Sequence, residues 1–361
     1  MINLTYNGKI TEPEILAKFH ETQVVQLPNP INSVLHGDNF EIMSNLLKQG
    51  FDNAIDLIYI DPPFATNNDF LIGDRISTVS QPKNGKLAYT DKFTKEEYLN
   101  FMHERLYLMH KMLSVQGSLY LHIDCKIGHY VKIILDEIFG ESNFISEITR
   151  RKSNPKNFAR KAYGNEKDTI YFYAKNKSNH IWNDITIPLT AEEMQKYAKT
   201  DENGNRYNTV PVHAPGESSG VTGGLWRDMP PPTGRHWRTS PQDLDELDRQ
   251  GLIEWSKNGN PRLKKFAHEH TGKKIQDIWD FKDPAYPLYP TQKNSEMLEL
   301  IVRQSSAENS LILDCFAGSG TALIAAKKHG RNFIGIDNSE IAVQVARRRL
   351  EEISVFQLKI P

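Results

Sequence analysis

The stretch LILDCFAGSGTALIAAKKHGRNFIGID, near the carboxyl end of the chain, permits few folds. An apolar run ends at Asp314, a turn carries Gly318 and Gly320, a helix-favouring stretch follows, and a second apolar run ends at Asp337. Glycine lets the backbone approach a ligand closely, and the first turn of a helix presents unpaired amide groups. The stretch therefore predicts a strand, a ligand-binding loop, a helix and a second strand in succession.

The ligand of this loop is expected to contain a nucleoside, because an acidic residue that closes the second strand is well placed to hold two ribose hydroxyls. The loop differs from the GxGxxG fingerprint of dinucleotide-binding proteins, since Thr321 follows the second glycine and no third glycine stands at the required spacing. Asp314 adds a carboxylate that suits an ammonium group better than a pyrophosphate. Together with the tetrapeptide described next, these features favour S-adenosylmethionine.

A third apolar run, DLIYI, leads into the tetrapeptide DPPF at Asp61 to Phe64. A strand that ends at Asp61 places its carboxylate at the edge where open α/β sheets bind ligands. Neither Pro62 nor Pro63 has an amide hydrogen, so the Asp61 carboxylate and the Pro62 carbonyl can act as paired acceptors, while Phe64 offers a ring face. Two acceptors and a ring match an amino group on a flat heteroaromatic base.

Short apolar runs alternate with amphipathic stretches, which predicts an α/β fold around a mostly parallel sheet. The expected strands are 33–36, 54–60, 117–123, 169–174, 310–313 and 332–336. The expected helices are 39–49, 95–113, 127–139, 294–305, 320–328 and 339–351. The polar segment 65–95 shows little periodicity and is expected to be a functional lid or a disordered loop.

Between residues 176 and 281 the chain becomes rich in Gly, Pro and Ser, which predicts a second, irregular unit. All five tryptophans lie in this segment: Trp182, Trp226, Trp237, Trp255 and Trp279. They can form a small core, or some of them can stack or wedge against nucleic acid, with neighbouring arginines reading guanine edges. Arg227, Arg235 and Arg238 are the candidates for base or phosphate contacts.

The chain has 361 residues and a formal net charge of −1, so its surface is not basic throughout. A nucleic-acid partner then requires a local basic face. The densest basic run is RRKSNPKNFARK, which begins with Arg150, Arg151 and Lys152; it is either a solvated loop or part of a DNA-binding surface. No apolar run or signal sequence indicates a membrane, and only two cysteines are present, so we expect a cytoplasmic protein without disulfides or a metal site.

The order of these motifs resembles the amino-directed DNA methyltransferases of the β permutation class. In that family a DPPY, DPPF or DPPW motif comes first, a target-recognition segment follows, and FxGxG comes last. The chain also resembles the modification subunits of type III restriction systems in NNDF at Asn67 and YTDKF at Tyr89. The resemblance implies a circularly permuted, Rossmann-like S-adenosylmethionine-dependent fold. Residues 1–175 would form its catalytic half, 176–281 the target-recognition region and 282–361 the cofactor-binding half.

The resemblance assigns roles to individual residues. It implies that Asp61, Pro62, Pro63 and Phe64 form the catalytic pocket. It places the cofactor's methionine part against Phe316, Gly318 and Gly320, its ribose against Asp337 and its adenine near Asp38. Thr291 and Lys293 in PTQK would close over the methionine end, and Asp314 and Thr321 complete the expected cofactor-binding residues. Cys315 replaces a proline of the usual motif, a change expected to be harmless.

The resulting hypothesis is a site-specific methyltransferase that modifies N6 of an adenine flipped out of double-stranded DNA. Cytosine-N4 methylation remains open as the same chemistry on a smaller ring, and an RNA or protein methylase or a non-catalytic nucleotide-binding module is a further alternative. Cytosine-C5 methylation needs a cysteine nucleophile, which in that family follows a proline. Neither Cys125 nor Cys315 follows a proline, so this reaction is excluded. The resemblance implies a homodimer, and a cognate restriction endonuclease is a possible partner. The stretch YLNFMHERLYLMHKML, within helix 95–113, has an apolar face broad enough for the core and a dimer partner, although core packing alone would explain it.

Overall fold

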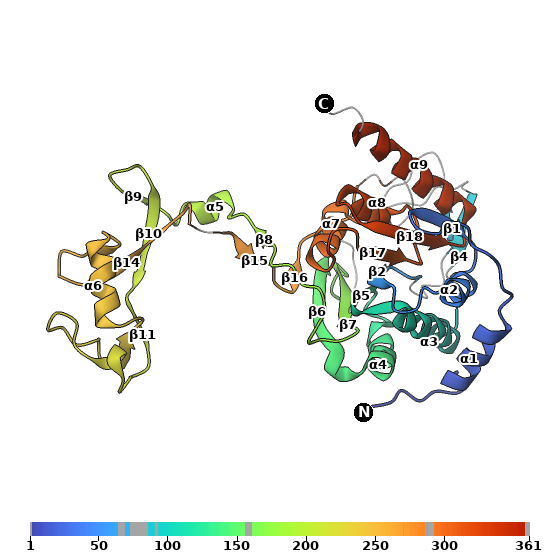
Figure 1. Cartoon of the computed structure of the whole chain (residues 1–361), viewed down its shortest axis with the longest axis horizontal. Coiled ribbons are helices and arrows are strands. Elements are labelled where there is room, and N and C mark those ends of the chain that lie inside the picture. Colours follow the sequence, from blue (N-terminus) through green and yellow to red (C-terminus); the bar gives the residue numbers. More distant parts are fainter. Residues whose placement is uncertain are drawn as a thin grey trace. The chain divides into compact units, whose positions relative to one another are not determined.

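The computed structural model describes residues 2–63, 69–72, 86–90, 93–155, 161–269, 271–285, 287 and 292–357. The chain divides into two compact units (Figure 1). The first consists of Met1–Asp184 together with Gln276–Pro361, and the second of Ile185–Ile275. The bounds of the second unit lie inside the irregular segment predicted over 176–281.

A large, mainly parallel sheet forms the centre of the first unit, with strand order β1-β18-β17-β2-β5-β7-β6-β16. Adjacent strands are parallel except at β7, which is antiparallel to both neighbours. Its strands are β1 (Ser33–His36), β2 (Ile55–Ile60), β5 (Leu113–Ile123), β6 (Phe144–Arg151), β7 (Lys167–Ala174), β16 (Ile278–Trp279), β17 (Leu311–Asp314) and β18 (Asn332–Asp337). The predicted α/β fold with a mostly parallel sheet is thus confirmed.

Helices cover the two faces of this sheet (Figure 1). On one face, α3 packs against both α2 and α4, and on the other α8 packs against both α7 and α9. The bounds are α1 (Glu12–Glu21), α2 (Asn39–Lys48), α3 (Lys95–Met112), α4 (Gly128–Phe139), α7 (Ser295–Gln304), α8 (Thr321–Lys328) and α9 (Glu340–Gln357). Side chains of Asp38, Thr94 and Asn294 accept hydrogen bonds from first-turn amides of α2, α3 and α7, so local capping fixes where these helices begin.

The helix expected to offer an apolar face to a second copy is covered within its own unit. Buried side chains occur on every side of α3, and they include Leu99, Met102, Leu108 and Met109. Packing against α2, α4 and the sheet accounts for its apolar residues. Core packing alone thus explains the apolar face of α3, which was one of the two interpretations, and the homodimer stays a prediction.

The parallel strands end at one edge of the sheet, and this edge collects acidic side chains. His36 of β1 lies opposite Asp337 of β18, and Asp314 of β17 lies opposite Gly335 of β18. Strand β17 also pairs with β2, whose last residue directly precedes Asp61. The carboxylates of Asp61, Asp314 and Asp337 therefore belong to neighbouring strand ends.

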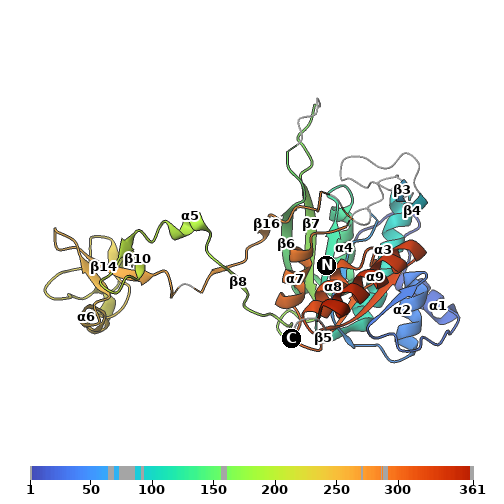
Figure 2. The same ribbon diagram turned by 90° about the horizontal axis from the view of Figure 1, so that it is seen from above.

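Strands from the two ends of the sequence are neighbours in this part of the sheet, since β17 and β18 lie between β1 and β2. Figure 2 shows the strands β6 and β7 side by side in the same unit, next to β16. The circular permutation implied by the family resemblance stays a prediction.

The second unit is built around short antiparallel strands, with one four-stranded sheet of order β13-β14-β10-β9. A small core combines Trp226, Trp237 and Leu244 with Val212 and Ile253. Its elements are β8 (Thr186–Ile187), α5 (Ala191–Met194), β9 (Lys199–Thr200), β10 (Arg206–Pro211), β11 (His213–Pro215), β12 (Arg235–Trp237), α6 (Pro241–Arg249), β13 (Ile253–Trp255), β14 (Pro261–Phe266) and β15 (Lys273–Lys274).

Two of the five tryptophans therefore form the small core that was one of the two interpretations. Trp255 stacks on Trp226 and remains partly exposed. Trp182 and Trp279 belong instead to the first unit, where Trp182 stacks on Phe172 and Trp279 lies buried in β16.

The segment 65–95, expected to be a lid or a disordered loop, contains two short strands in its described part. β3 (Asp69–Ile72) and β4 (Lys86–Thr90) pair antiparallel. Across the described ranges, no helix combines the length and the hydropathy needed to span a membrane.

Candidate active site

The centre of the site is an ion pair between Asp61 and Lys293. Strand β2 is buried along almost its whole length, which fixes the position at which the chain emerges as Asp61. Lys293 Nζ lies 2.8 Å from Asp61 Oδ2, and the side chains are only 9% and 16% exposed, respectively. Two residues that are 232 positions apart in the sequence thus meet at the end of β2.

The second oxygen of the same carboxylate is buried without a partner. Among the described residues, Asp61 Oδ1 has no hydrogen-bond donor, although a buried carboxylate oxygen without one is unfavourable. Pro62 is buried and Pro63 is half-buried, while Phe64 lies outside the described residues. The site therefore holds one carboxylate oxygen that can accept a hydrogen bond from a ligand.

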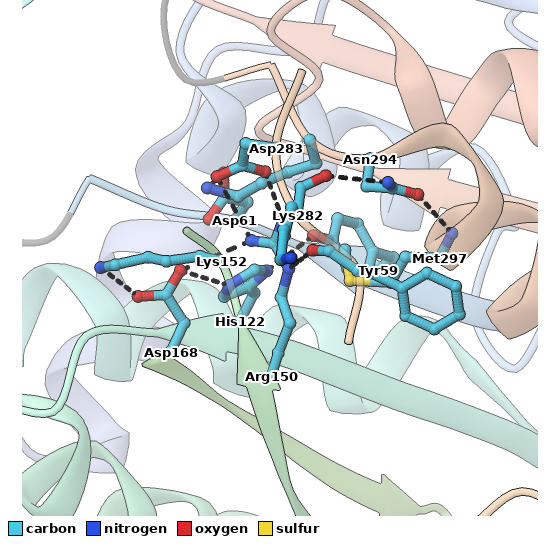
Figure 3. A network of polar contacts seen from close by, with 12 residues as sticks. Tyr59, Asp61, His122, Arg150, Lys152, Asp168, Lys282, Asp283, Asn294 and Met297 are labelled. Carbon is cyan, nitrogen blue, oxygen red and sulfur yellow. Dashed lines mark hydrogen bonds and ion pairs between the residues drawn. The ribbon is translucent and has the colours of Figure 1, made fainter. Parts of the chain in front are cut away.

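A chain of buried polar side chains lies behind Asp61 (Figure 3). His122 Nδ1 is 3.0 Å from the Tyr59 hydroxyl, and His122 Nε2 is 3.1 Å from Asp168 Oδ2. Lys152 Nζ donates to Asp168 Oδ1 at 2.6 Å. Since a carboxylate only accepts, Nε2 of the neutral imidazole carries the proton and Nδ1 accepts from Tyr59.

The protonation states of this chain follow from its burial. Burial lowers the pKa of His122, and the nearby Lys293 ammonium lowers it further, so the imidazole is neutral. Burial opposes ionisation of Asp168, but the His122 hydrogen bond and the nearby ammonium groups outweigh it and lower the pKa of this carboxyl. Burial raises the pKa of Tyr59 well above its usual value, so its hydroxyl keeps its proton.

Arg150 ties the strand β6 to the segment that follows β16. Its side chain is fully buried; Nε donates to the Phe281 carbonyl at 2.7 Å, and Nη2 pairs with Asp283 Oδ1. Nη1 also lies 3.6 Å from Asp168 Oδ2. The expectation that Arg150 contacts DNA is therefore wrong, because its guanidinium is enclosed and bound to protein acceptors.

The two basic neighbours of Arg150 differ from it. Arg151 is exposed and lies 3.2 Å from the equally exposed Asp280, so it remains available to a nucleic acid. Lys152 is mostly buried and bound to Asp168. Only part of the basic run is thus a free surface.

The glycine loop after β17 is held against the end of β18. Gly318 and Gly320 have φ angles of 51° and 75°, and a Cβ on Gly320 would lie 2.9 Å from the Ala346 Cβ of α9. The Gly318 amide donates to Asp337 Oδ2 at 2.8 Å. Glycine is required here both by the left-handed backbone and by the close approach of α9.

Carboxylates accumulate around this loop. Asp314 is 3% exposed and accepts one hydrogen bond, from the Phe316 amide at 3.1 Å. Burial raises the pKa of Asp314 well above its usual value, and repulsion by Asp61 and Asp337 raises it further. Burial also raises the pKa of Asp337. A ligand that brings positive charge to this edge would relieve the repulsion.

Asp38 lies beside the same edge, but the protein already uses both of its oxygens. Oδ1 caps α2 by accepting from the Phe40 amide at 2.8 Å, and Oδ2 pairs with Arg105 Nη2 at 2.8 Å. The adjacent Asn39 donates to the carbonyl of Cys315 at 2.8 Å. A direct role of Asp38 toward a ligand stays a prediction.

The remaining predicted residues are placed as follows. Thr321 is buried at the start of α8, and Phe316 is half-buried and packs against Phe101. Thr291 lies outside the described residues, whereas Lys293 reaches Asp61 as described above. Among the residues that the structure describes, no cluster of three or more His, Cys, Asp or Glu side chains could hold a metal ion.

The three arginines predicted in the second unit divide into two kinds. Arg227 is paired with Asp245 at 2.7 Å and with Asp248 at 2.6 Å. Arg235 and Arg238 are exposed and, within the described ranges, form no ion pair with a carboxylate; they contact His213 and the Pro211 carbonyl instead.

A basic cluster surrounds His213. Its pKa is lowered by partial burial and then by Arg235, Arg238 and Arg262, which come from different parts of the second unit. Arg262 was not among the predicted DNA contacts; it donates to the Thr209 hydroxyl at 2.9 Å and to the Thr209 carbonyl at 2.8 Å.

Sequence reasoning also missed the polar chain behind Asp61. His122 and Asp168 stand at the ends of the apolar runs LYLHI and DTIYFYA, where a polar residue breaks an otherwise buried strand. That position at a strand end was the available signal. Asp283 gave none, because it lies in an irregular segment.

Comparison with known proteins gives one family. The family model described as DNA methylase, which covers N6 and N4 methyltransferases, matches residues 55–348. The type II methyltransferase M.EcaI of Enterobacter cloacae is 38% identical over 96% of this chain and 77% of its own length. The StyLTI Mod subunit, a type III restriction-modification enzyme of Salmonella typhimurium, is 26% identical over 96% of this chain and 59% of its own length.

The chain thus spans less than two thirds of that Mod subunit. Among solved structures, the complex of M1.HpyAVI with SAM is similar with a TM-score of 0.48 and 17% identity, over 88% of this chain and 99% of that one.

The buried Arg150 and the exposed Arg151 form a matched pair for a stability test. Arg150→Met removes the fully buried cation that pairs with Asp283 and lies close to Asp168, so we expect the free energy of unfolding of the first unit to fall by about 3–5 kcal/mol. Arg151→Gln removes only an exposed pair, for which about 0–1 kcal/mol is expected. Hydrogen exchange of the β5 and β7 amides under native conditions measures both changes. Equal effects would contradict the assignment of Arg150 to the interior.

Proposed function

The chain belongs to the N6/N4 DNA methylase family, and from that premise we propose that it transfers a methyl group from S-adenosylmethionine to N6 of an adenine flipped out of duplex DNA. The observation that carries the proposal is the buried Asp61 Oδ1 at the end of β2, which has no hydrogen-bond partner in the described part of the chain and is followed by two prolines. This oxygen is an acceptor for one N–H of an amino group, and the Pro62 carbonyl is the second proposed acceptor.

These two acceptors suit the reaction because the amino group of adenine is a poor nucleophile. Its lone pair is delocalised into the ring, and hydrogen bonds to both N–H groups favour a tetrahedral nitrogen whose lone pair points away from the ring plane. Transfer would join that lone pair to the methyl carbon while the electrons of the methyl–sulfur bond pass to sulfur, and the proton that the nitrogen then loses would pass to solvent. Positioning of this kind can supply effective molarities of roughly 10⁵–10⁸ M.

The residues around the glycine loop fit S-adenosylmethionine, which supplies a methyl group on a positively charged sulfur. Repulsion among Asp61, Asp314 and Asp337 favours a ligand that carries positive charge, and the methionine part brings an ammonium group as well. We propose that Asp314, Phe316, Gly318, Gly320 and Thr321 hold the methionine part and that Asp337 holds the ribose. Asp38 and Thr291 complete the proposed cofactor-binding residues, whereas Lys293, which the family resemblance adds to them, pairs with Asp61.

Adenine is preferred over cytosine because the catalytic tetrapeptide begins with Asp61, and an acidic first residue is more typical of adenine enzymes of the resembled family. A base inside a duplex cannot reach a pocket at the end of β2, so the target base is proposed to be flipped out and stacked on Phe64. The cytosine-N4 alternative uses the same two acceptors.

The basic cluster of the second unit is proposed to bind the DNA backbone. Arg235 and Arg238 are exposed and have no carboxylate partner in the described part of the chain, so a phosphate can take that place. Arg227 already has two carboxylate partners and is a weaker candidate than the sequence suggested. Arg151 is proposed as a further contact from the first unit.

The remaining partners are also proposals. The relatives are type II methyltransferases and type III restriction-modification subunits, which supports a role of this chain in restriction-modification and a cognate endonuclease partner. A homodimer and a cytoplasmic location stay predictions. Sedimentation equilibrium at micromolar concentration is expected to give twice the chain mass of 41.3 kDa, and a single-chain mass would contradict the dimer.

Identification of the product tests the proposed function. Duplex DNA is incubated with the enzyme and methyl-labelled S-adenosylmethionine, then digested to nucleosides, and the labelled nucleoside is expected to be N6-methyladenosine in its deoxy form. Label in N4-methylcytosine would establish the alternative.

Asp61→Ala is expected to abolish transfer with little effect on cofactor affinity, whereas Gly318→Asp is expected to abolish cofactor binding. Identical behaviour of the two variants would contradict the proposed division between Asp61 and the loop.

The salt dependence of DNA binding tests the basic cluster. Each phosphate contact contributes about 0.9 to the slope of log affinity against log salt concentration. If both arginines bind phosphate, Arg235→Gln with Arg238→Gln is expected to make the slope shallower by about 1.8. Arg227→Gln, which removes a cation that is already paired, is expected to leave the slope unchanged. A slope that responds only to Arg227 would reverse the assignment.

A further inference from the structure

We propose that Lys293 is a positioning residue that holds the Asp61 carboxylate in the orientation needed for methyl transfer. The proposal rests on the proposed function above and adds a role that differs from the one suggested for this lysine by family resemblance. There, Lys293 closes over the methionine end of the cofactor. In the structure, Lys293 pairs instead with the carboxylate of Asp61, the proposed catalytic residue.

The geometry around Asp61 supports this role. Lys293 Nζ occupies one oxygen, Oδ2, at 2.8 Å, while Oδ1 stays without a partner among the described residues. The terminal torsion of an aspartate is broad and roughly two-fold, so the strand alone does not fix where its oxygens point. Fixing Oδ2 selects one orientation and leaves Oδ1 for the amino group of the base.

Lys293 is itself fixed by the segment that carries it. Upstream, Arg150 binds the Phe281 carbonyl and the Asp283 carboxylate. The residue after Lys293, Asn294, donates to the Lys282 carbonyl at 2.8 Å and caps α7 through its side-chain oxygen (Figure 3). The chain is therefore anchored on β6 at Phe281 and Asp283 and, directly after Lys293, at the start of α7.

The charges around Lys293 keep it a cation. Burial alone would lower the pKa of its ammonium, but attraction to surrounding carboxylates outweighs burial and raises the pKa. In the described part of the chain, the charged and titratable groups that act on the pair include Tyr59 of β2, Asp168 of β7, His122 of β5, Arg150 of β6, Asp283 after β16 and Asp314 of β17. Because carboxylates predominate among these groups, the Lys293 ammonium offsets the repulsion that they exert on the Asp61 carboxylate.

The two roles of Lys293 separate in a comparison of Lys293→Met with Lys293→Arg. Methionine keeps much of the side-chain volume without the charge, and arginine restores a donor and the charge. A misplacement of about 1 Å can cost about 100-fold in rate, so Lys293→Met is expected to lower the single-turnover rate at saturating DNA and S-adenosylmethionine by about 100-fold. Its dissociation constant for S-adenosylmethionine is expected to change by less than about threefold. Arginine is expected to recover at least about tenfold of the rate.

The pH profile gives a readout that a merely structural role would not move. Removal of the ammonium leaves a mostly buried carboxylate among other carboxylates, which favours its protonated form. The acidic limb of the single-turnover profile of Lys293→Met is therefore expected to shift to higher pH relative to the wild type. The matched control is Lys328→Met, which removes an exposed lysine of α8 that pairs with Glu299 of α7. This variant is expected to keep the wild-type rate and pH profile.

Three results would overturn the proposal. A loss of S-adenosylmethionine affinity with an unchanged rate at saturation would assign Lys293 to the cofactor. Wild-type rates in Lys293→Met, or an unshifted acidic limb together with a reduced rate, would remove the positioning role. Failure of the wild-type enzyme to label DNA would instead refute the proposed function, so the wild-type product assay distinguishes the two. If Lys293→Met does not fold, Lys293→Arg against Lys293→Gln repeats the test, and equal rates in that pair would overturn the proposal.

Discussion

The structure depends on the burial of several carboxylates at one edge of a parallel sheet. Asp61, Asp314 and Asp337 come from neighbouring strand ends because β2, β17 and β18 run in the same direction. Buried carboxylates need hydrogen bonds or cations to remain ionised. The two halves of the edge meet this requirement differently: Asp61 and Asp168 have lysine partners from the protein, whereas the charged groups that act on Asp314 are carboxylates.

The strand ends could be predicted from the sequence because they depend on local patterns. The strand 33–36 agrees with β1, and 332–336 and 320–328 differ by one residue from β18 and α8. The prediction differed at β5, which begins at Leu113 and not at 117. There the register against β2 shifts, since Ile55 lies opposite Leu113 but Leu57 lies opposite Ser118, and such an irregularity leaves no periodic signal in a single strand.

Long-range contacts account for what the sequence did not reveal. Arg150 bonds a carbonyl 131 residues away, and its role depends on the pairing of β6 with β16. A run of cations is usually solvated, which favoured the surface interpretation. The alternation of a strand contradicts it, because Ile148 and Arg150 face inward while Arg151 faces solvent. The residue types of FISEITRR do not show this two-residue period, because two arginines stand side by side at its end and only the fold distinguishes them.

The distribution of charge also explains why one site can combine a fixed acceptor with a cofactor that is exchanged in every cycle. On the proposed function, the cation beside Asp61 belongs to the chain, so the acceptor for the base is in place before any ligand arrives. The positive charge beside Asp314 comes with the methyl donor and is reduced when its sulfur becomes neutral after transfer. The same repulsion among carboxylates that favours binding of the donor therefore weakens the hold on the product, while Lys293 keeps Asp61 in place for the next base.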